Sequence, residues 1–211
     1  MTDLWSERAD AYRDAADQRE GADLDLLVSW AEGETALDVA TGGGHTASRL
    51  REAGFRVTTL DPAPGMKPDV LARAEEIPFA DSSFDVVTCR IAPHHFDDVE
   101  AAVREMARVA CRLVLIEDTL FESEQVEEAE KLRDPTHVRS YTEAEWRAFL
   151  EGSGLAIEQV EIHEKRRPLE DWLARTATTG QEAQQVKALL ADAIEDGQYV
   201  DRKILLKARK P

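Results

Sequence analysis

Two acidic residues and a run of glycines have the types and the spacing to hold a nucleotide-like ligand. Asp38 lies in the apolar run TALDVA, and Gly42, Gly43 and Gly44 follow it directly. Glycine has no Cβ, so the backbone there can turn sharply and come close to a ligand. Asp61 ends the next apolar run, near the spacing at which doubly wound folds place a carboxylate against ribose hydroxyls. The pattern predicts a nucleotide-like site at the carboxyl ends of two strands.

A pair of histidines offers acid–base chemistry at the same edge of the predicted sheet. His94 and His95 follow the run FDVVTCR (84–90), on the carboxyl side where α/β folds bind ligands. A histidine of ordinary pKa could take a proton from a hydroxyl or a carbon acid. Packing or capping of the loop is the alternative role for either ring. No paired-carboxylate pattern accompanies the two rings, so we predict no metal site.

Further candidates lie later in the chain. His137, in DPTHVRSY, could serve as a base, and Arg139 could anchor an acidic substrate. An ordinary surface-loop position is the alternative for His137. Asp118 comes at the end of an apolar run and near the predicted pocket, but it could instead cap the helix that follows.

Strands and helices that alternate along the chain must position these residues. The predicted strands are 35–40, 55–60, 70–72, 84–90, 112–116, 157–164 and 199–208. The predicted helices are 4–16, 24–31, 45–54, 98–109, 124–132, 142–150, 169–176 and 181–195, with one more that could start at residue 72. Pro62, Pro64 and Pro68 exclude a normal helix after the second strand, so that crossover is predicted to be a loop. The order favours an α/β, Rossmann-like doubly wound, mostly parallel seven-stranded sheet with helices on both faces.

Composition limits the classes of function. The 211 residues carry a formal net charge of −17, which argues against nucleic acid or an anionic membrane as the main partner. No apolar stretch approaches the length of a membrane span, and the N-terminus lacks the pattern of a signal peptide. Cys89 and Cys111 form no disulfide framework. We therefore predict a cytoplasmic protein with reduced thiols; the oligomeric state is unknown at this stage.

Several blocks together resemble one family. They are LDVATGGGHTA (37–47), AEEIPFADSSFDVVTCRIAPHHF (74–96), REMARV (104–109), LRDPTHVRSYTEAEWRAFLEGSGL (132–155) and KILLKARK (203–210). With Asp61, they are similar to the class I S-adenosylmethionine-dependent methyltransferases. Within these, the match is to the type 11 group that includes the ubiquinone and menaquinone biosynthesis C-methyltransferases. The resemblance covers almost the whole chain and implies S-adenosylmethionine as the cofactor.

The resemblance also implies a role for each cofactor-binding position. The turn Gly42–Gly44, with Ala40 and Thr41 before it, would pass under the methionine part of the cofactor. Asp38 would orient this turn or meet the amino group, and Asp61 would accept hydrogen bonds from both ribose hydroxyls. The other expected contacts are Tyr12 over the sulfonium, Pro62 and Met66 in the adenine cover, Ala74 and Glu75 beside the adenine, and Arg90 and Ile91 on the floor. Trp5 is expected to be a core aromatic.

One position departs from the family at the adenine end. Arg73 stands where members usually carry an aspartate that accepts a bond from the adenine amine. A guanidinium has only donors, so Glu75 or the backbone would have to take over.

Together these observations predict methyl transfer from S-adenosylmethionine to a small-molecule acceptor, by C- or O-methylation. Arg73 motivates one alternative, a non-catalytic relative that binds the cofactor. A second alternative is an NAD(P)-dependent oxidoreductase, although the turn ATGGG does not match G-x-G-x-x-G. We expect a single methyltransferase domain over 1–211. Its parts are a helical lid (1–33), a cofactor-binding core (34–119) and a substrate-side and C-terminal part (120–211).

Overall fold

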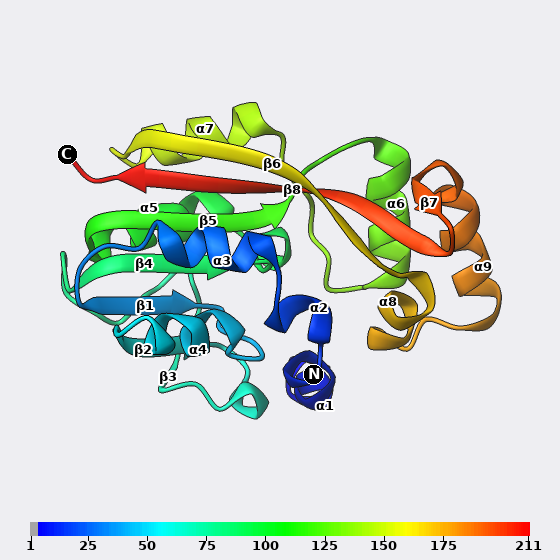
Figure 1. Ribbon diagram of the computed structural model, residues 1–211, viewed down its shortest axis with the longest axis horizontal. Helices are drawn as coiled ribbons and strands as arrows, with labels where there is room; N and C mark the ends of the chain where they lie inside the picture. The colour runs from blue at the N-terminus through cyan, green and yellow to red at the C-terminus, as the bar shows by residue number, and fades with distance from the viewer. Residues whose placement is uncertain (1–3) are drawn as a thin grey trace.

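The computed structural model describes residues 4–211, without the side chains of residues 16 and 17, and within this range the chain folds around one sheet (Figure 1). Its strands are β1 Thr35–Val39, β2 Arg56–Asp61, β3 Val70–Leu71, β4 Phe84–Arg90, β5 Ala110–Thr119, β6 Ala156–Pro168, β7 Ile194–Glu195 and β8 Gln198–Arg209. Its α-helices are α1 Leu4–Arg13, α2 Ala16–Arg19, α3 Ala22–Ser29, α4 His45–Glu52, α5 Val99–Val109, α6 Glu124–Arg133, α7 Glu143–Gly152, α8 Leu169–Arg175 and α9 Gly180–Leu189. Short 3-10 turns are η1 Pro64–Met66, η2 Pro93–His95 and η3 Ala191–Ala193. Residues 1–3, part of the predicted lid 1–33, lie outside the described residues.

The sheet of the described residues has eight strands, one more than predicted, because the short β7 adds to β8. The strands run β3-β2-β1-β4-β5-β8-β6, and β7 pairs only with β8. All neighbours from β3 to β5 are parallel, whereas β8 is antiparallel to both β5 and β6. This confirms the mostly parallel α/β fold class. Only η1 separates β2 from β3, so the predicted loss of that crossover helix is also confirmed.

Alternating side chains divide the core between the two faces of the sheet. Leu37 and Val39 of β1 pack on one side, in the cluster that holds Trp146 of α7 and Met106 of α5. Ala36 points to the other side, where α3 and α4 cover the sheet (Figure 1). Both faces are buried because parallel strands with crossover helices leave neither face in water.

A long two-stranded ribbon extends beyond the parallel strands. β6 and β8 pair along their whole length to Pro168 opposite Gln198, while β5 pairs with β8 only as far as Lys203. The free part of the ribbon carries α8, α9 and β7, and α6 packs beside them (Figure 1). The predicted strand 157–164 was therefore too short. The charged run from Lys165 to Arg167 looked like a loop but continues the strand.

Three other element predictions were wrong. The N-terminal helix ends at Arg13 and a second one begins at Ala16, and no helix forms after residue 72. The predicted helix 181–195 ends at Leu189, because the chain enters the β7–β8 hairpin. Asp196 and Gly197 form its two-residue turn, both with positive φ (48° and 76°), which is the turn that Asp-Gly favours.

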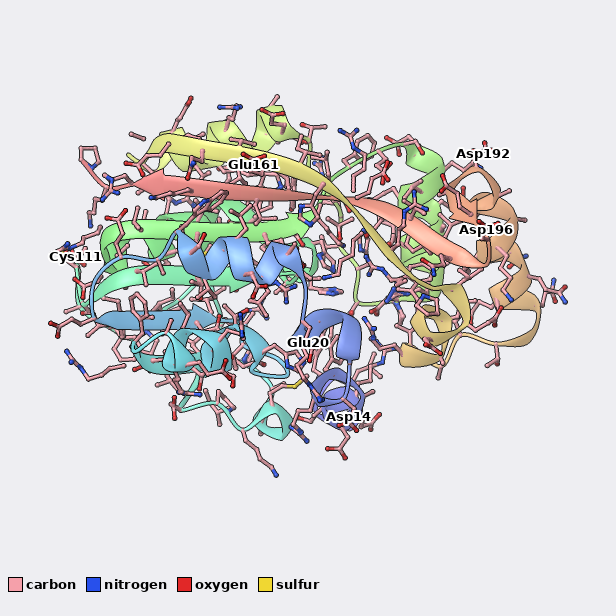
Figure 2. The ribbon with its side chains drawn as sticks, viewed as in Figure 1. Asp14, Glu20, Cys111, Glu161, Asp192 and Asp196 are labelled. Carbon is pink, nitrogen blue, oxygen red and sulfur yellow. The ribbon has the colours of Figure 1, made fainter. Side chains whose placement is uncertain are left out.

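The surface of the molecule is strongly acidic. Exposed carboxylates, including Asp14, Glu161, Asp192 and Asp196, project from widely separated elements (Figure 2). Cys111 is exposed on β5 and Cys89 is buried in β4, and both are free thiols. Among the described helices, none is both long and apolar enough to cross a membrane.

Candidate active site

The glycine turn is held from below by Asp38. The Thr41 hydroxyl donates to Asp38 Oδ2 (2.6 Å) and the Thr88 hydroxyl donates to Oδ1 (2.8 Å). Burial raises the pKa of Asp38 to about 6. Gly42 and Gly44 have positive φ (49° and 78°), so the turn needs glycine at these positions. Asp38 therefore orients the turn from inside the protein.

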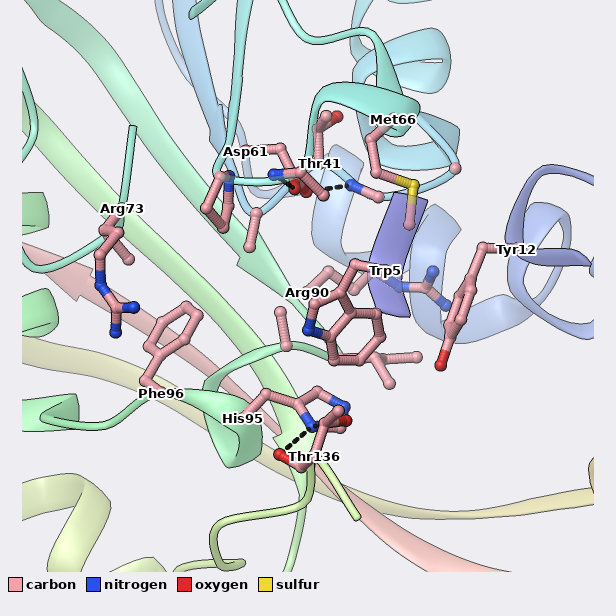
Figure 3. Close-up of a pocket in the computed structure, with 18 of the residues that line it drawn as sticks. Trp5, Tyr12, Thr41, Asp61, Met66, Arg73, Arg90, His95, Phe96 and Thr136 are labelled. Carbon is pink, nitrogen blue, oxygen red and sulfur yellow. Dashed lines mark hydrogen bonds between the residues drawn. The ribbon is translucent and has the colours of Figure 1, made fainter. Parts of the chain in front are cut away.

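Asp61 ties the tip of β2 to the same turn. Its Oδ2 accepts the Gly42 amide (3.0 Å) and its Oδ1 accepts the Ala63 amide (2.9 Å). The side chain is buried, yet it forms part of the wall of a cavity (Figure 3). The carboxylate is thus fixed at the carboxyl end of two parallel strands.

The cavity has a volume of about 500 Å³, within the range of pockets that enclose small-molecule ligands. It brings together most of the predicted site. The predicted residues in its wall are Tyr12, Ala40, Thr41, Gly42, Gly43, Asp61, Pro62, Met66, Ala74, Glu75, Arg90, Ile91 and His95. The predicted residues outside its wall are Asp38, Gly44, His94 and His137.

His95 occupies the end of the cavity opposite Asp61 (Figure 3). Its Nδ1 donates to the Thr136 carbonyl (3.0 Å), which leaves Nε2 as the acceptor nitrogen of a neutral ring. Burial and the neighbouring His94 hold the pKa of His95 well below its ordinary value. The imidazole is therefore neutral at pH 7, the state that a general base requires.

His94 and His137 are placed elsewhere. His94 is buried behind His95, with Nδ1 2.5 Å from Asp118 Oδ1, and His137 Nε2 donates to Glu127 Oε1 (3.1 Å). Both face a second, smaller cavity. Asp118 does not cap α6.

Ser123 caps α6 instead, and its hydroxyl accepts the Val126 amide. Arg139 pairs with Glu145 (2.7 Å) and lines neither cavity, so it is no substrate anchor in this structure.

Arg90 belongs to a buried ionic cluster under the floor. Its Nη2 lies 2.6 Å from Asp23 Oδ2, its Nε donates to Glu117, and Lys165 Nζ lies 2.6 Å from Asp23. Asp23, Glu117 and His163 are close enough to suggest a metal site. Because Arg90 and Lys165 already neutralise the two carboxylates, we expect no metal ion there.

Arg73 lies at the rim of the adenine end. Its guanidinium pairs with Glu75 (3.1 Å) and Asp97 (2.6 Å), and more than half of its side chain is exposed. Glu75 also accepts the Asp97 amide (3.2 Å). The arginine that departs from the family thus positions the carboxylate expected to replace the missing aspartate.

Several residues of the cavity wall are not among those predicted from the sequence. Trp5 is not a core aromatic: its half-buried ring lies edge-on to His95, 4.6 Å between centroids, and 5.6 Å from Tyr12 (Figure 3). Phe96 and Val138 complete the apolar part of the wall. Phe96 lies beside the predicted base, so the His94–His95 loop contained a signal for it. Val138 is brought in only by the tertiary fold.

Several known proteins are similar to this chain in sequence and fold. The family described as "Methyltransferase domain", type 11, matches residues 37–112. An uncharacterized methyltransferase of Bacillus subtilis, YcgJ, is 32% identical over 91% of this chain and 86% of its own. The structure of the BH2331 protein from Bacillus halodurans superposes with a TM-score of 0.80 at 31% identity, covering 90% of this chain and all of that one.

A demethylmenaquinone methyltransferase of Corynebacterium urealyticum is 36% identical over a shorter stretch, 37% of this chain and 38% of its own. These relatives favour a methyltransferase over the nicotinamide-dependent oxidoreductase and the non-catalytic relative. The chain belongs to the class I S-adenosylmethionine-dependent methyltransferases of type 11, and it is a methyltransferase with S-adenosylmethionine as its cofactor.

Proposed function

We propose that this protein methylates a hydroxyl or an acidic carbon of a small-molecule acceptor, with His95 as the general base. One observation carries the proposal. A single cavity of about 500 Å³ has the glycine turn and Asp61 in one wall and the acceptor nitrogen of a neutral histidine in the opposite wall. A cofactor and a proton acceptor can thus face one another across one enclosed space.

The residues of the turn fit the methionine and ribose parts of the cofactor. A Cβ built on Gly42 would meet only the Ala40 carbonyl, at 3.9 Å, so this side of the turn is open to a ligand. Each oxygen of a carboxylate can accept more than one hydrogen bond. Asp61 can therefore hold the turn and still accept the ribose hydroxyls.

The adenine would lie between Met66 and Pro62 on one side and Ala74 on the other, with Glu75 as acceptor for its amine. All four residues line the cavity. Met66 is buried against Ala63 and Ala9, which gives the adenine a packed apolar surface.

When bound, S-adenosylmethionine supplies an electrophilic methyl group on a positively charged sulfur. The aromatic faces of Trp5 and Tyr12 would favour that positive charge. His95 would take the proton of the acceptor at Nε2, since Nδ1 is held by the Thr136 carbonyl. Trp5, Phe96 and Val138 would exclude water from the acceptor.

The N-terminal part would close the site. The Tyr12 carbonyl lies 2.9 Å from His45 Nε2, and the Ser6 hydroxyl accepts the Gly65 amide (2.7 Å). These contacts place α1 over the glycine turn and the adenine cover. They support the proposed division of the domain into a lid, a core and a substrate side.

The test combines binding with turnover. Titration calorimetry with S-adenosylmethionine should show one site, and a panel of phenols and carbon acids should reveal an acceptor through formation of S-adenosylhomocysteine. With that acceptor, His95→Gln should lower kcat by roughly 10²–10⁴-fold and change cofactor affinity less than about 3-fold. His163→Gln, outside the cavity, is the control. Full activity of His95→Gln would refute the role of His95, and absent cofactor binding would refute the proposed site.

A further inference from the structure

A second cavity continues the first one past His95. Its volume is about 40 Å³, and it shares Tyr12, Gln18, Ile91 and His95 with the wall of the main cavity. We call it the inner chamber. It lies where α6, α8 and the β6–β8 ribbon meet the N-terminal helices.

Cations dominate the walls of the inner chamber. Arg133, Arg167, Arg175 and Lys203 line it, against the two carboxylates Glu130 and Asp134. The whole chain, by contrast, has a net charge of −17. Such a local reversal of charge inside an acidic protein produces a positive potential that attracts anions.

The nearby acids are largely engaged by other groups. Asp201 pairs with both Arg167 and Lys203, so one carboxylate serves two cations. Asp134 accepts from the Thr136 hydroxyl (2.7 Å) and pairs with Arg8 (3.0 Å).

Glu130 accepts the Tyr199 hydroxyl (3.2 Å), and Asp118 lies against His94. The charge of Lys203 and Arg133 adds to burial in holding the pKa of His94 below its ordinary value. Each of these acids thus has a partner other than Arg133, although one oxygen of Asp118 and one of Asp134 have no hydrogen-bond partner among the described residues.

Among the cations of the inner chamber, Arg133 shows most clearly a guanidinium whose hydrogen bonds are not all made. Its side chain is 8% exposed and lies over the Trp172 ring, 4.1 Å from the centroid. Its carboxylate contacts are long, 3.5 Å to Glu130 and 4.0 Å to Asp134, and its Nε has no hydrogen-bond partner among the described residues. A buried donor without a partner costs about 1–3 kcal/mol, which a bound anion would recover.

We propose that the inner chamber binds the carboxylate of an acidic acceptor, held by Arg133 and Arg175. The proposal rests on the proposed function, since it names the substrate class of that site. A single water needs about 10–15 Å³ of such volume, so the chamber holds about three heavy atoms, the size of a carboxylate. A phosphate has five heavy atoms and is too large.

The shared wall fixes how such an acceptor lies. With its carboxylate in the chamber, the body of the acceptor passes Ile91 and Tyr12 and reaches His95, which borders both cavities. The group to be methylated then faces the base and the cofactor side of the main cavity. Charge at one end of the acceptor therefore sets the position of the reacting group at the other end.

The test measures binding to protein loaded with S-adenosylhomocysteine, by titration calorimetry. The probes are acetate against acetamide, 4-hydroxybenzoate against its methyl ester, and phenyl phosphate. Each carboxylate should bind at least about 10-fold more tightly than its neutral analogue, the ratio for one charge-assisted contact. Phenyl phosphate should bind no better than the neutral compounds.

Two variants locate the anion. Arg133→Met should reduce carboxylate binding to the level of the neutral analogue. Arg175→Gln, at the half-buried end of α8, should weaken it at least about 3-fold and tests the proposal if Arg133→Met does not fold. Arg147→Met is the control, since this residue pairs with Glu143 on α7, away from both cavities.

The possible failures are separate. Loss of discrimination between carboxylates and neutral analogues, tighter binding of phenyl phosphate, or unchanged carboxylate binding in the folded variants would overturn the proposal. Failure of S-adenosylhomocysteine to bind would instead count against the proposed function. Binding of S-adenosylhomocysteine without any preference for carboxylates would overturn this proposal but leave the proposed function intact.

Discussion

The two ends of the cavity are built in different ways. The cofactor end comes from the tips of β1, β2 and β4 and their loops, all within residues 35–97. The inner chamber comes from α1, α6, α8 and the β6–β8 ribbon, which lie far apart in the chain, and His95 of η2 borders both cavities. One buried aspartate, Asp61, lines the cofactor end, whereas four cations line the chamber.

The difference shows how one sheet can combine a fixed chemistry with a changeable specificity. Parallel neighbouring strands must end at the same edge, so β1 and β2 bring the turn and Asp61 together through backbone pairing alone. The chamber depends on side chains from an extension that the parallel sheet does not need. Its charge can therefore change without disturbing the cofactor end.

The largest effect is expected at Asp61. Asp61→Ala should weaken S-adenosylmethionine binding at least about 100-fold in calorimetry, because two charge-assisted hydrogen bonds of about 1.5–3 kcal/mol each are lost. The melting temperature should also fall, since Asp61 holds the Gly42 and Ala63 amides. Asp81→Ala, an exposed carboxylate paired with Arg108, is the control. Unchanged affinity would mean that the ribose does not bind at the end of β2.

The next largest effect is expected at acid pH, which should destabilise the walls of the inner chamber before the cofactor end. Burial alone would raise the pKa of Asp134, but hydrogen bonds from Thr136 and nearby positive charge lower it to about 2. Burial alone would likewise raise the pKa of Asp201, but the charges of Arg167 and Lys203 lower it to about 2. Stability from such groups is present above their unfolded pKa near 4 and is lost as the pH falls through 2. For Asp201 this amounts to about 2 kcal/mol.

The cofactor end responds to acid in the opposite direction at Asp38. Burial raises its pKa to about 6, so its contribution is fully present below about pH 4 and is lost as the pH rises through 6. Asp23 is the counterexample near the floor, because Lys165 and Arg90 outweigh burial and lower its pKa. Limited digestion with pepsin between pH 4 and 2.5 should cut α6 and the β6–β8 ribbon before β1, β2 and β4. First cuts in the parallel strands would contradict this.

A smaller effect is expected where α1 meets the turn. A Cβ on Gly43 would lie 2.7 Å from the Tyr12 carbonyl and 2.9 Å from His45 Nε2, so Gly43→Ala must push α1 outward. Overpacking of this kind costs about 1–3 kcal/mol, or about 2–12 °C in melting temperature for a chain of this size. Gly152→Ala meets no atom within 4 Å and is the control. Equal melting temperatures for both variants would show that α1 does not rest on the turn.

Local patterns allowed the cofactor end to be predicted from the sequence. The apolar runs that became β1 and β2 end near Gly42 and at Asp61, the run that became β4 follows the turn at Asp81, and the boundaries of all three shift by at most one residue in the structure. The Thr142–Glu145 capping box also starts α7, within one residue of the predicted helix start. In each case the signal lies within a few residues, where turn and cap chemistry act.

The inner chamber could not be predicted in the same way. Arg133, Arg167 and Lys203 meet only because the ribbon extends past β5, and no spacing in the sequence encodes that meeting. The charged residues at 165–167 hid the strand, because strand prediction relies on apolar alternation. The Asp196–Gly197 pair is a hairpin signal, but it comes directly after the helical pattern that predicts a helix over 181–195.

Arg73 should give the smallest effect, although it is the clearest departure from the family in the sequence. Its ion pairs with Glu75 and Asp97 are at the surface, where each contributes about 0–1 kcal/mol. Arg73→Ala also frees the Glu75 carboxylate to accept the adenine amine, which offsets the lost positioning. Cofactor affinity should therefore change less than about 3-fold in calorimetry, while Glu75→Ala should weaken it about 10-fold, the value of one lost charge-assisted bond. A large loss in Arg73→Ala with no loss in Glu75→Ala would mean that the adenine is held at the rim by the arginine itself, and the cofactor end would then share the cationic character of the chamber.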